Sequence, residues 1–143
     1  MKINKKQILD FVKSKGVIVV IDRTSASKTF TSDEGKVVIS LHGDENEPMM
    51  TMVAFHEVFH ALGILNNRMY LNAEHKGLVE ELAANEFARE MTEMAGEMTE
   101  EVKNCCDYVE KSILKKLKNK IVAKKQAKVR ANNCIELIKE ELK

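Results

Sequence analysis

Two histidines four residues apart, with a glutamate directly after the first, have the clearest chemical potential in this chain. His56, Glu57 and His60 form the pattern HExxH. Residues four apart lie on one face of an α-helix, so His56 and His60 can bind one metal ion. Glu57 lies about 100° round the helix from His56, near enough to take a proton from a water molecule on that metal. The pattern predicts two zinc ligands and a general base; the alternative is a helix with two partly buried histidines.

A catalytic zinc ion takes three protein ligands and keeps a fourth position for water, so one ligand is missing. The longer pattern HExxHxxGxxH would place it at Asn66, but a neutral amide is a poor zinc ligand. A carboxylate on the following helix is the better source. Glu81 and Asn85 are four residues apart, and the alanines between them permit close helix packing. We therefore expect Glu81 as the third ligand and Asn85 as a polar group that holds a histidine. The other glutamates near this helix, expected to be solvated, are Glu74, Glu80 and Glu86.

Stabilisation of an oxyanion requires one more hydrogen-bond donor. Tyr70 and His75 lie in or near the connection between the two expected metal-binding helices, and the spacing selects neither of them. His42 reaches the site only if the fold brings it there.

Composition sets the broad class of the protein. The chain has 143 residues, 44% of them hydrophobic and 31% charged, which is typical of one soluble domain. We find no apolar run near the ~20 residues of a membrane span and no signal peptide, so we expect a cytoplasmic protein without a membrane partner. Three cysteines without CxxC spacing, Cys105, Cys106 and Cys134, fit that compartment as small hydrophobic residues.

The net charge of +1 hides an uneven distribution along the chain. The charged residues of 74–110 are mostly acidic, whereas 111–134 contains basic residues and no acidic one. These basic residues are Lys111, Lys115, Lys116, Lys118, Lys120, Lys124, Lys125, Lys128 and Arg130. They can hold an acidic partner or nucleic-acid phosphates. Alternatively, Ile113, Leu117 and Ile121 recur at helical spacing and predict a packed helix whose lysines are solvated or neutralised by the acidic region.

The hydrophobic pattern predicts one helix, then strands, then further helices. The run 17–21 is unbroken and β-branched, which favours a strand covered on both faces. The remaining expected elements are helices at 5–15, 48–65, about 72–95, 99–119 and around Ile135 to Leu142, with strands at 29–31 and 36–41. The two later strands should form a hairpin about the turn 33–35. This order predicts an α+β fold with a small sheet packed on the metal-binding helices. We assign 1–98 to this domain and 99–143 to a helical C-terminal extension packed on it.

Two segments together resemble the ImmA/IrrE family of zinc metallopeptidases. They are TMVAFHEVFHALG at 51–63 and ELAANEFA at 81–88, the second similar to the family motif ExxANxFA. The likeness covers roughly 18–91. It implies a zincin-like core, a gluzincin-like ligand set of His56, His60 and Glu81 on Zn²⁺, Glu57 as the base, and Asn85 as partner of a histidine. After Ala88 the chain departs from the family, because the usual leucines and proline are missing.

The resemblance implies a hydrolase that cleaves a peptide bond in a regulatory protein such as a repressor. Glu57 would take a proton from a zinc-bound water and pass it to the leaving amine. The alternative from another class is a non-catalytic, zinc-containing interaction protein. It would bind a protein partner, or less favourably nucleic acid, through 111–130; no aromatic residue lies among these lysines to stack on bases.

Overall fold

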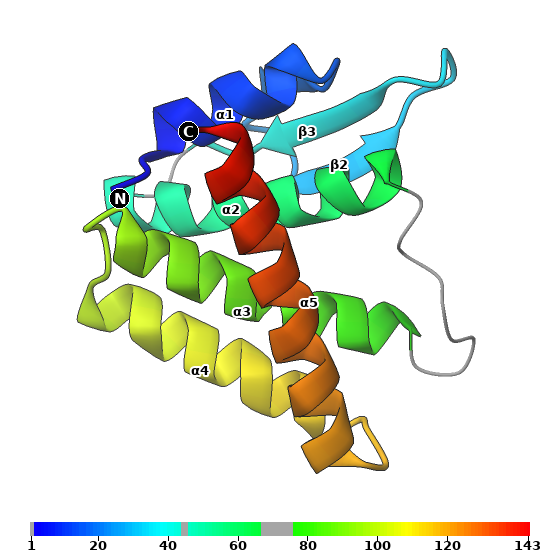
Figure 1. Ribbon diagram of the computed structural model, residues 1–143, viewed down its shortest axis with the longest axis vertical. Coiled ribbons are helices and arrows are strands. Elements are labelled where there is room, and N and C mark those ends of the chain that lie inside the picture. Colours follow the sequence, from blue (N-terminus) through cyan, green and yellow to red (C-terminus); the bar gives the residue numbers. More distant parts are fainter. Residues whose placement is uncertain (1, 44–45, 67–75) are drawn as a thin grey trace.

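The computed structural model describes residues 2–43, 46–66 and 76–143, and the α+β class expected from the sequence is confirmed (Figure 1). The helices are α1 (Lys5–Ser14), α2 (Glu47–Leu65), α3 (Lys76–Met94), α4 (Glu100–Leu114) and α5 (Lys120–Glu141). The strands are β1 (Ile18–Ile21), β2 (Lys28–Thr31) and β3 (Val37–Leu41). Their order along the chain is the one that the hydrophobic pattern predicts.

The sheet is mixed, with the strand order β1-β3-β2. β2 and β3 form the expected antiparallel hairpin, in which Thr29 pairs with Ile39. Its turn is closed by Gly35, whose φ of 80° is a left-handed conformation that glycine adopts without steric cost. β1 pairs with β3 in parallel. Both edges of the sheet therefore belong to short strands, and β3 lies at its centre.

The prediction that 17–21 forms a strand covered on both faces is wrong. β1 is an edge strand, and Ile21 remains 57% exposed. All five residues of β3 are buried instead. A run of β-branched residues reports the preference for an extended backbone, whereas burial depends on which strand has neighbours on both sides.

α2 is the central helix. Asn46 caps its N-terminus by accepting a hydrogen bond from the Met49 amide, Pro48 stands in its first turn, and Asn66 follows its last residue. It packs against α1, β2, β3, α3 and α4. By length and composition α2 could cross a membrane, so the expectation of no such run was wrong; 56% of its most apolar window is buried inside the protein, as in the core helix of a soluble domain.

The last two helices pack on α3. α5 runs across α3 and ends close to α1 (Figure 1), where Lys15 Nζ lies 3.6 Å from Glu141. Small side chains of α5 allow its close approach to the core; they are Ala123, Ala127 and Ala131. The helix expected at 99–119 begins as predicted, at the Thr99 cap, but ends at Leu114. Ile121 therefore belongs to the first turn of α5, which begins at Lys120, and the prediction that it packs with Ile113 and Leu117 is wrong, since it is 71% exposed.

Candidate metal centre

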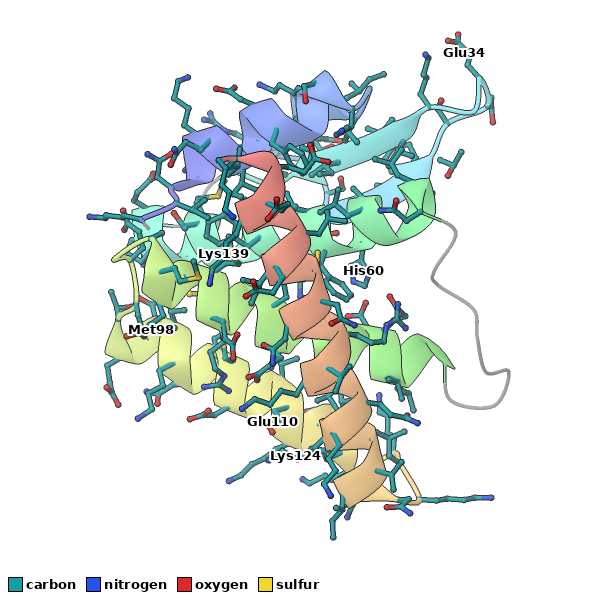
Figure 2. The ribbon with its side chains drawn as sticks, viewed as in Figure 1. Glu34, His60, Met98, Glu110, Lys124 and Lys139 are labelled. Atoms are coloured by element: carbon teal, nitrogen blue, oxygen red, sulfur yellow. The ribbon has the colours of Figure 1, made fainter. Side chains whose placement is uncertain are left out.

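Three side chains from two packed helices, α2 and α3, converge on one another. His56 and His60 project from α2 toward α3, which supplies Glu81; Figure 2 labels His60 in this position. The two Nε2 atoms of the histidines are 3.2 Å apart. Glu81 Oε1 lies 2.7 Å from His60 Nε2, and its Oε2 lies 3.4 Å from His56 Nε2. One possible ligand atom from each of the three residues can be chosen so that all three lie within 4.8 Å of one another.

These distances fit a shared metal ion. Ligand atoms bound tetrahedrally at about 2.0 to 2.1 Å from a metal are about 3.3 to 3.4 Å apart. Two of the three separations are within 0.2 Å of that span, and the third, between His60 and Glu81, is a hydrogen-bond distance that a metal would lengthen. Two neutral imidazoles and one carboxylate form a donor set that divalent transition metals accept. The residues present are therefore compatible with a bound metal.

The electrostatics of the cluster keep Glu81 ionised. Hydrogen bonds from His56 and then from His60 hold the pKa of the Glu81 carboxyl far below its ordinary value, while its partial burial acts in the opposite direction. A metal binds the deprotonated carboxylate, so no proton has to leave Glu81 before a cation enters at neutral pH.

The expected base, Glu57, is buried beside this cluster and is only 7% exposed. The Thr29 hydroxyl on β2 lies 2.8 Å from Glu57 Oε1 and donates to it. Sequence analysis missed Thr29, because it precedes Glu57 by 28 residues and belongs to no local motif. The hairpin pairing expected at 29–31 was the one available signal, since a strand that flanks the metal helix brings its side chains to the site.

Two cavities open on either side of His56 and Glu57, which line both of them. One, of about 560 Å³, is walled by Met52, Val53 and Val109 and reaches Asn85. The other, of about 440 Å³, has the more polar wall, formed by Lys28, Thr29, His60, Glu80 and Glu81. The candidate centre is therefore open to molecules on both sides.

His42 belongs to the first cavity, so the fold does bring it to the cleft. Its Nδ1 lies 2.9 Å from the Ser25 carbonyl oxygen, a contact in which the imidazole nitrogen must be the donor. The other oxyanion candidates, Tyr70 and His75, lie outside the described residues, as does Glu74. Asn66, the rejected third ligand, donates from Nδ2 to the Leu62 carbonyl at 2.8 Å and closes α2.

Asn85 has a hydrogen-bond partner that the sequence analysis did not indicate. Its Nδ2 donates to the Cys106 carbonyl oxygen on α4 at 3.0 Å, and the residue is 3% exposed. This contact joins α3 to α4. Asn85 and His56 do line the same cavity, but a hydrogen bond between them stays a prediction.

We expect Asn85→Ala to lower the free energy of unfolding by about 1 to 3 kcal/mol, because the Cys106 carbonyl is left buried without its donor. If Asn85 also orients a histidine, metal affinity should fall by about 10- to 100-fold in the same variant. Chemical denaturation and competitive metal titration measure the two effects separately. Unchanged stability would contradict the α3–α4 role, and unchanged metal affinity would remove the histidine role.

The prediction that Glu80 is solvated is wrong. Glu80 is 2% exposed and forms an ion pair with Arg130 of α5. A buried carboxylate is stable only beside a compensating charge. Arg130, which is far away in the sequence but in contact in the fold, supplies that charge. Glu110 and Lys124 form a second pair between the acidic and basic regions, at 3.1 Å. Part of the charge at 111–130 is therefore neutralised inside the fold.

Two of the three cysteines, Cys105 and Cys106, have thiols that are unreactive at neutral pH. Burial raises the pKa of the Cys106 thiol to about 11. Burial and then the nearby Glu101 also raise the pKa of Cys105. Since the thiolate is the reactive form, both residues stay protonated at neutral pH.

Comparisons of the chain with models of protein families, with curated proteins and with solved structures give no match. The resemblance to the ImmA/IrrE family therefore depends on the two motifs and on the geometry that they produce.

Proposed function

We propose that this protein is a zinc metallopeptidase of ImmA/IrrE type that hydrolyses a peptide bond in a regulatory protein. The observation that carries the proposal is the convergence of His56, His60 and Glu81 beside a buried glutamate. HExxH predicts the first two ligands, whereas the packing of α2 against α3 adds the carboxylate of Glu81, 21 residues after His60. A helix with two incidental histidines would not require this third group.

The residues divide the chemical work between them. When bound, zinc would polarise a substrate carbonyl and lower the pKa of a water molecule. Glu57 accepts the proton of the attacking water and afterwards passes it to the amide nitrogen that leaves. His56, His60 and Glu81 hold their positions because they belong to two packed helices. The cavities on either side of Glu57 support the binding of the substrate polypeptide on both sides of the cleaved peptide bond.

A specific observation also supports the alternative, a zinc-containing interaction protein. The outer face of α5 combines exposed lysines with exposed aliphatic residues, among them Ile121, Val122 and Val129. Such a face suits a protein partner better than nucleic acid, because charged phosphates form no favourable apolar contacts with aliphatic side chains. This surface and a catalytic centre are compatible on one chain.

Elemental analysis of protein purified without added metal tests the metal assignment. We expect about one zinc per chain, because two histidines and a carboxylate form a set that zinc prefers. Preparation in parallel with added EDTA is the control and should yield metal-free protein. Absence of zinc, nickel, cobalt, iron and manganese from the first preparation would contradict the proposal.

A further inference from the structure

Thr29 lies on β2 and lines the cavity of about 440 Å³, the one with the more polar wall. Its hydroxyl contacts helix α2. The Oγ1 atom is 2.8 Å from Glu57 Oε1 and 3.0 Å from the main-chain oxygen of the same residue. A strand residue and the expected base are thus joined by contacts to two different oxygens of one glutamate. Neither contact is needed to pair β2 with β3, because that pairing uses the backbone.

A threonine hydroxyl has one proton and cannot donate fully to two acceptors at once. Hydrogen bonds to an ionised carboxylate are roughly twice as strong as those to a neutral carbonyl. The proton therefore goes to Oε1 while Glu57 is charged.

We propose that Thr29 is a positioning residue for the base: it fixes Glu57 Oε1, so that Oε2 is the oxygen that receives the proton of the attacking water. This inference rests on the proposed function and adds to it a residue outside both sequence motifs. Glu57 is nearly enclosed, and a carboxylate in such a place needs a donor to remain in one orientation. Thr29 supplies that donor from the strand rather than from the metal-binding helices.

Substitutions at this residue separate the hydroxyl from the shape of the side chain. Thr29→Val removes the hydroxyl and keeps the volume, Thr29→Ala removes both, and Thr29→Ser keeps the hydroxyl. Thr31→Val is the matched control, because Thr31 lies on the same strand two residues away and its side chain points to the same face. Glu57→Gln serves as the reference for complete loss of the base.

The readout is binding of acetohydroxamic acid to the cobalt-substituted protein, followed in the visible spectrum. On binding, the acid gives its O–H proton to the base and its two oxygens bind the metal, so its affinity reports the placement of Glu57 without any peptide substrate. We expect Thr29→Val and Thr29→Ala to weaken this affinity by about 10-fold or more, the effect of losing one hydrogen bond to a charged group. Thr29→Ser should remain within about 3-fold of the parent, and so should Thr31→Val, since the hydrogen bond persists in both.

Metal content and thermal unfolding are measured on every variant. A packing role alone would lower the melting temperature and leave hydroxamate affinity per bound metal unchanged, which would overturn the inference. So would a loss of affinity in Thr29→Ser equal to that in Thr29→Val. Should Thr29→Val fail to fold, the comparison of Thr29→Ser with Thr29→Ala decides the question in the same way.

Failure of the proposed function has a different signature. If Glu57→Gln binds the hydroxamic acid as tightly as the parent, Glu57 accepts no proton and the peptidase mechanism is wrong. If Glu57→Gln weakens binding while Thr29→Val does not, the base stands and only the role of Thr29 is refuted.

Discussion

His60→Ala and Glu81→Ala should each lose most of the bound metal. The metal affinity should fall by more than ~100-fold, which is the upper limit of the usual loss when a partner of a ligand, rather than a ligand itself, is removed. Each removes one of three protein ligands, and the remaining two side chains do not close a tetrahedral site. The measurement is metal content after gel filtration, followed by competitive titration of the metal-free protein. Of the three expected ligands, Glu81 alone belongs to α3. Its loss therefore also removes the link that the metal would make between α3 and α2.

Two controls make this result specific. Asn66→Ala should keep its metal, because the Asn66 amide donates to the Leu62 carbonyl at the end of α2. EDTA should lower the melting temperature of the parent, since a ligand present at about 1,000 times its Kd stabilises the folded state by about 4 kcal/mol. The same chelator should change the melting temperature of His60→Ala little. Retention of metal by Glu81→Ala together with its loss in Asn66→Ala would show that the third ligand is misassigned.

The features that sequence analysis predicted well depend on residues close together in the chain. The helices expected to start at 5 and 99 begin at Lys5 and Glu100, where Asn4 and Thr99 cap them, because a cap needs only an amide two or three residues away. HExxH is local in the same sense, and its helical spacing fixes the relation of the two histidines. The approach of Glu81 to the two histidines was predictable, because the i, i+4 pair with Asn85 and the intervening alanines indicate a helix face suited to packing.

The features that sequence analysis missed depend on contacts between distant segments. Arg130 neutralises Glu80 from a position 50 residues further along the chain, and the Cys106 carbonyl oxygen accepts a hydrogen bond from Asn85 that no local pattern indicates. β1 is exposed because β3 takes the central place, which no pattern within 17–21 encodes. The break after Leu114 has a similar origin: Ile113 and Leu117 are both buried, but the chain turns between them, and Ile121 points to solvent.

Glu57→Gln should keep the metal and the fold while reducing peptide hydrolysis by at least ~100-fold, the usual effect of removing a general base. Glutamine is nearly isosteric, and its amide oxygen can still accept the hydrogen bond that Thr29 donates to Oε1. The amide nitrogen then occupies the place of Oε2, where it can donate to a water molecule but cannot take its proton. Metal content, melting temperature and cleavage of a peptide library, read by mass spectrometry, are measured on the same preparation.

This variant separates the two proposed classes of protein more sharply than any ligand variant, because it changes neither the metal site nor the surface of α5. A protein that acts only by binding should tolerate Glu57→Gln, since affinity for a partner through Ile121, Val122 and the neighbouring lysines requires no proton acceptor in the core. A peptidase should lose the turnover of its target in cells while still binding it, so that the target accumulates with the inactive protein attached. Full biological effect of a metal-loaded Glu57→Gln protein would exclude the enzyme, and the function would then lie on the outer face of α5.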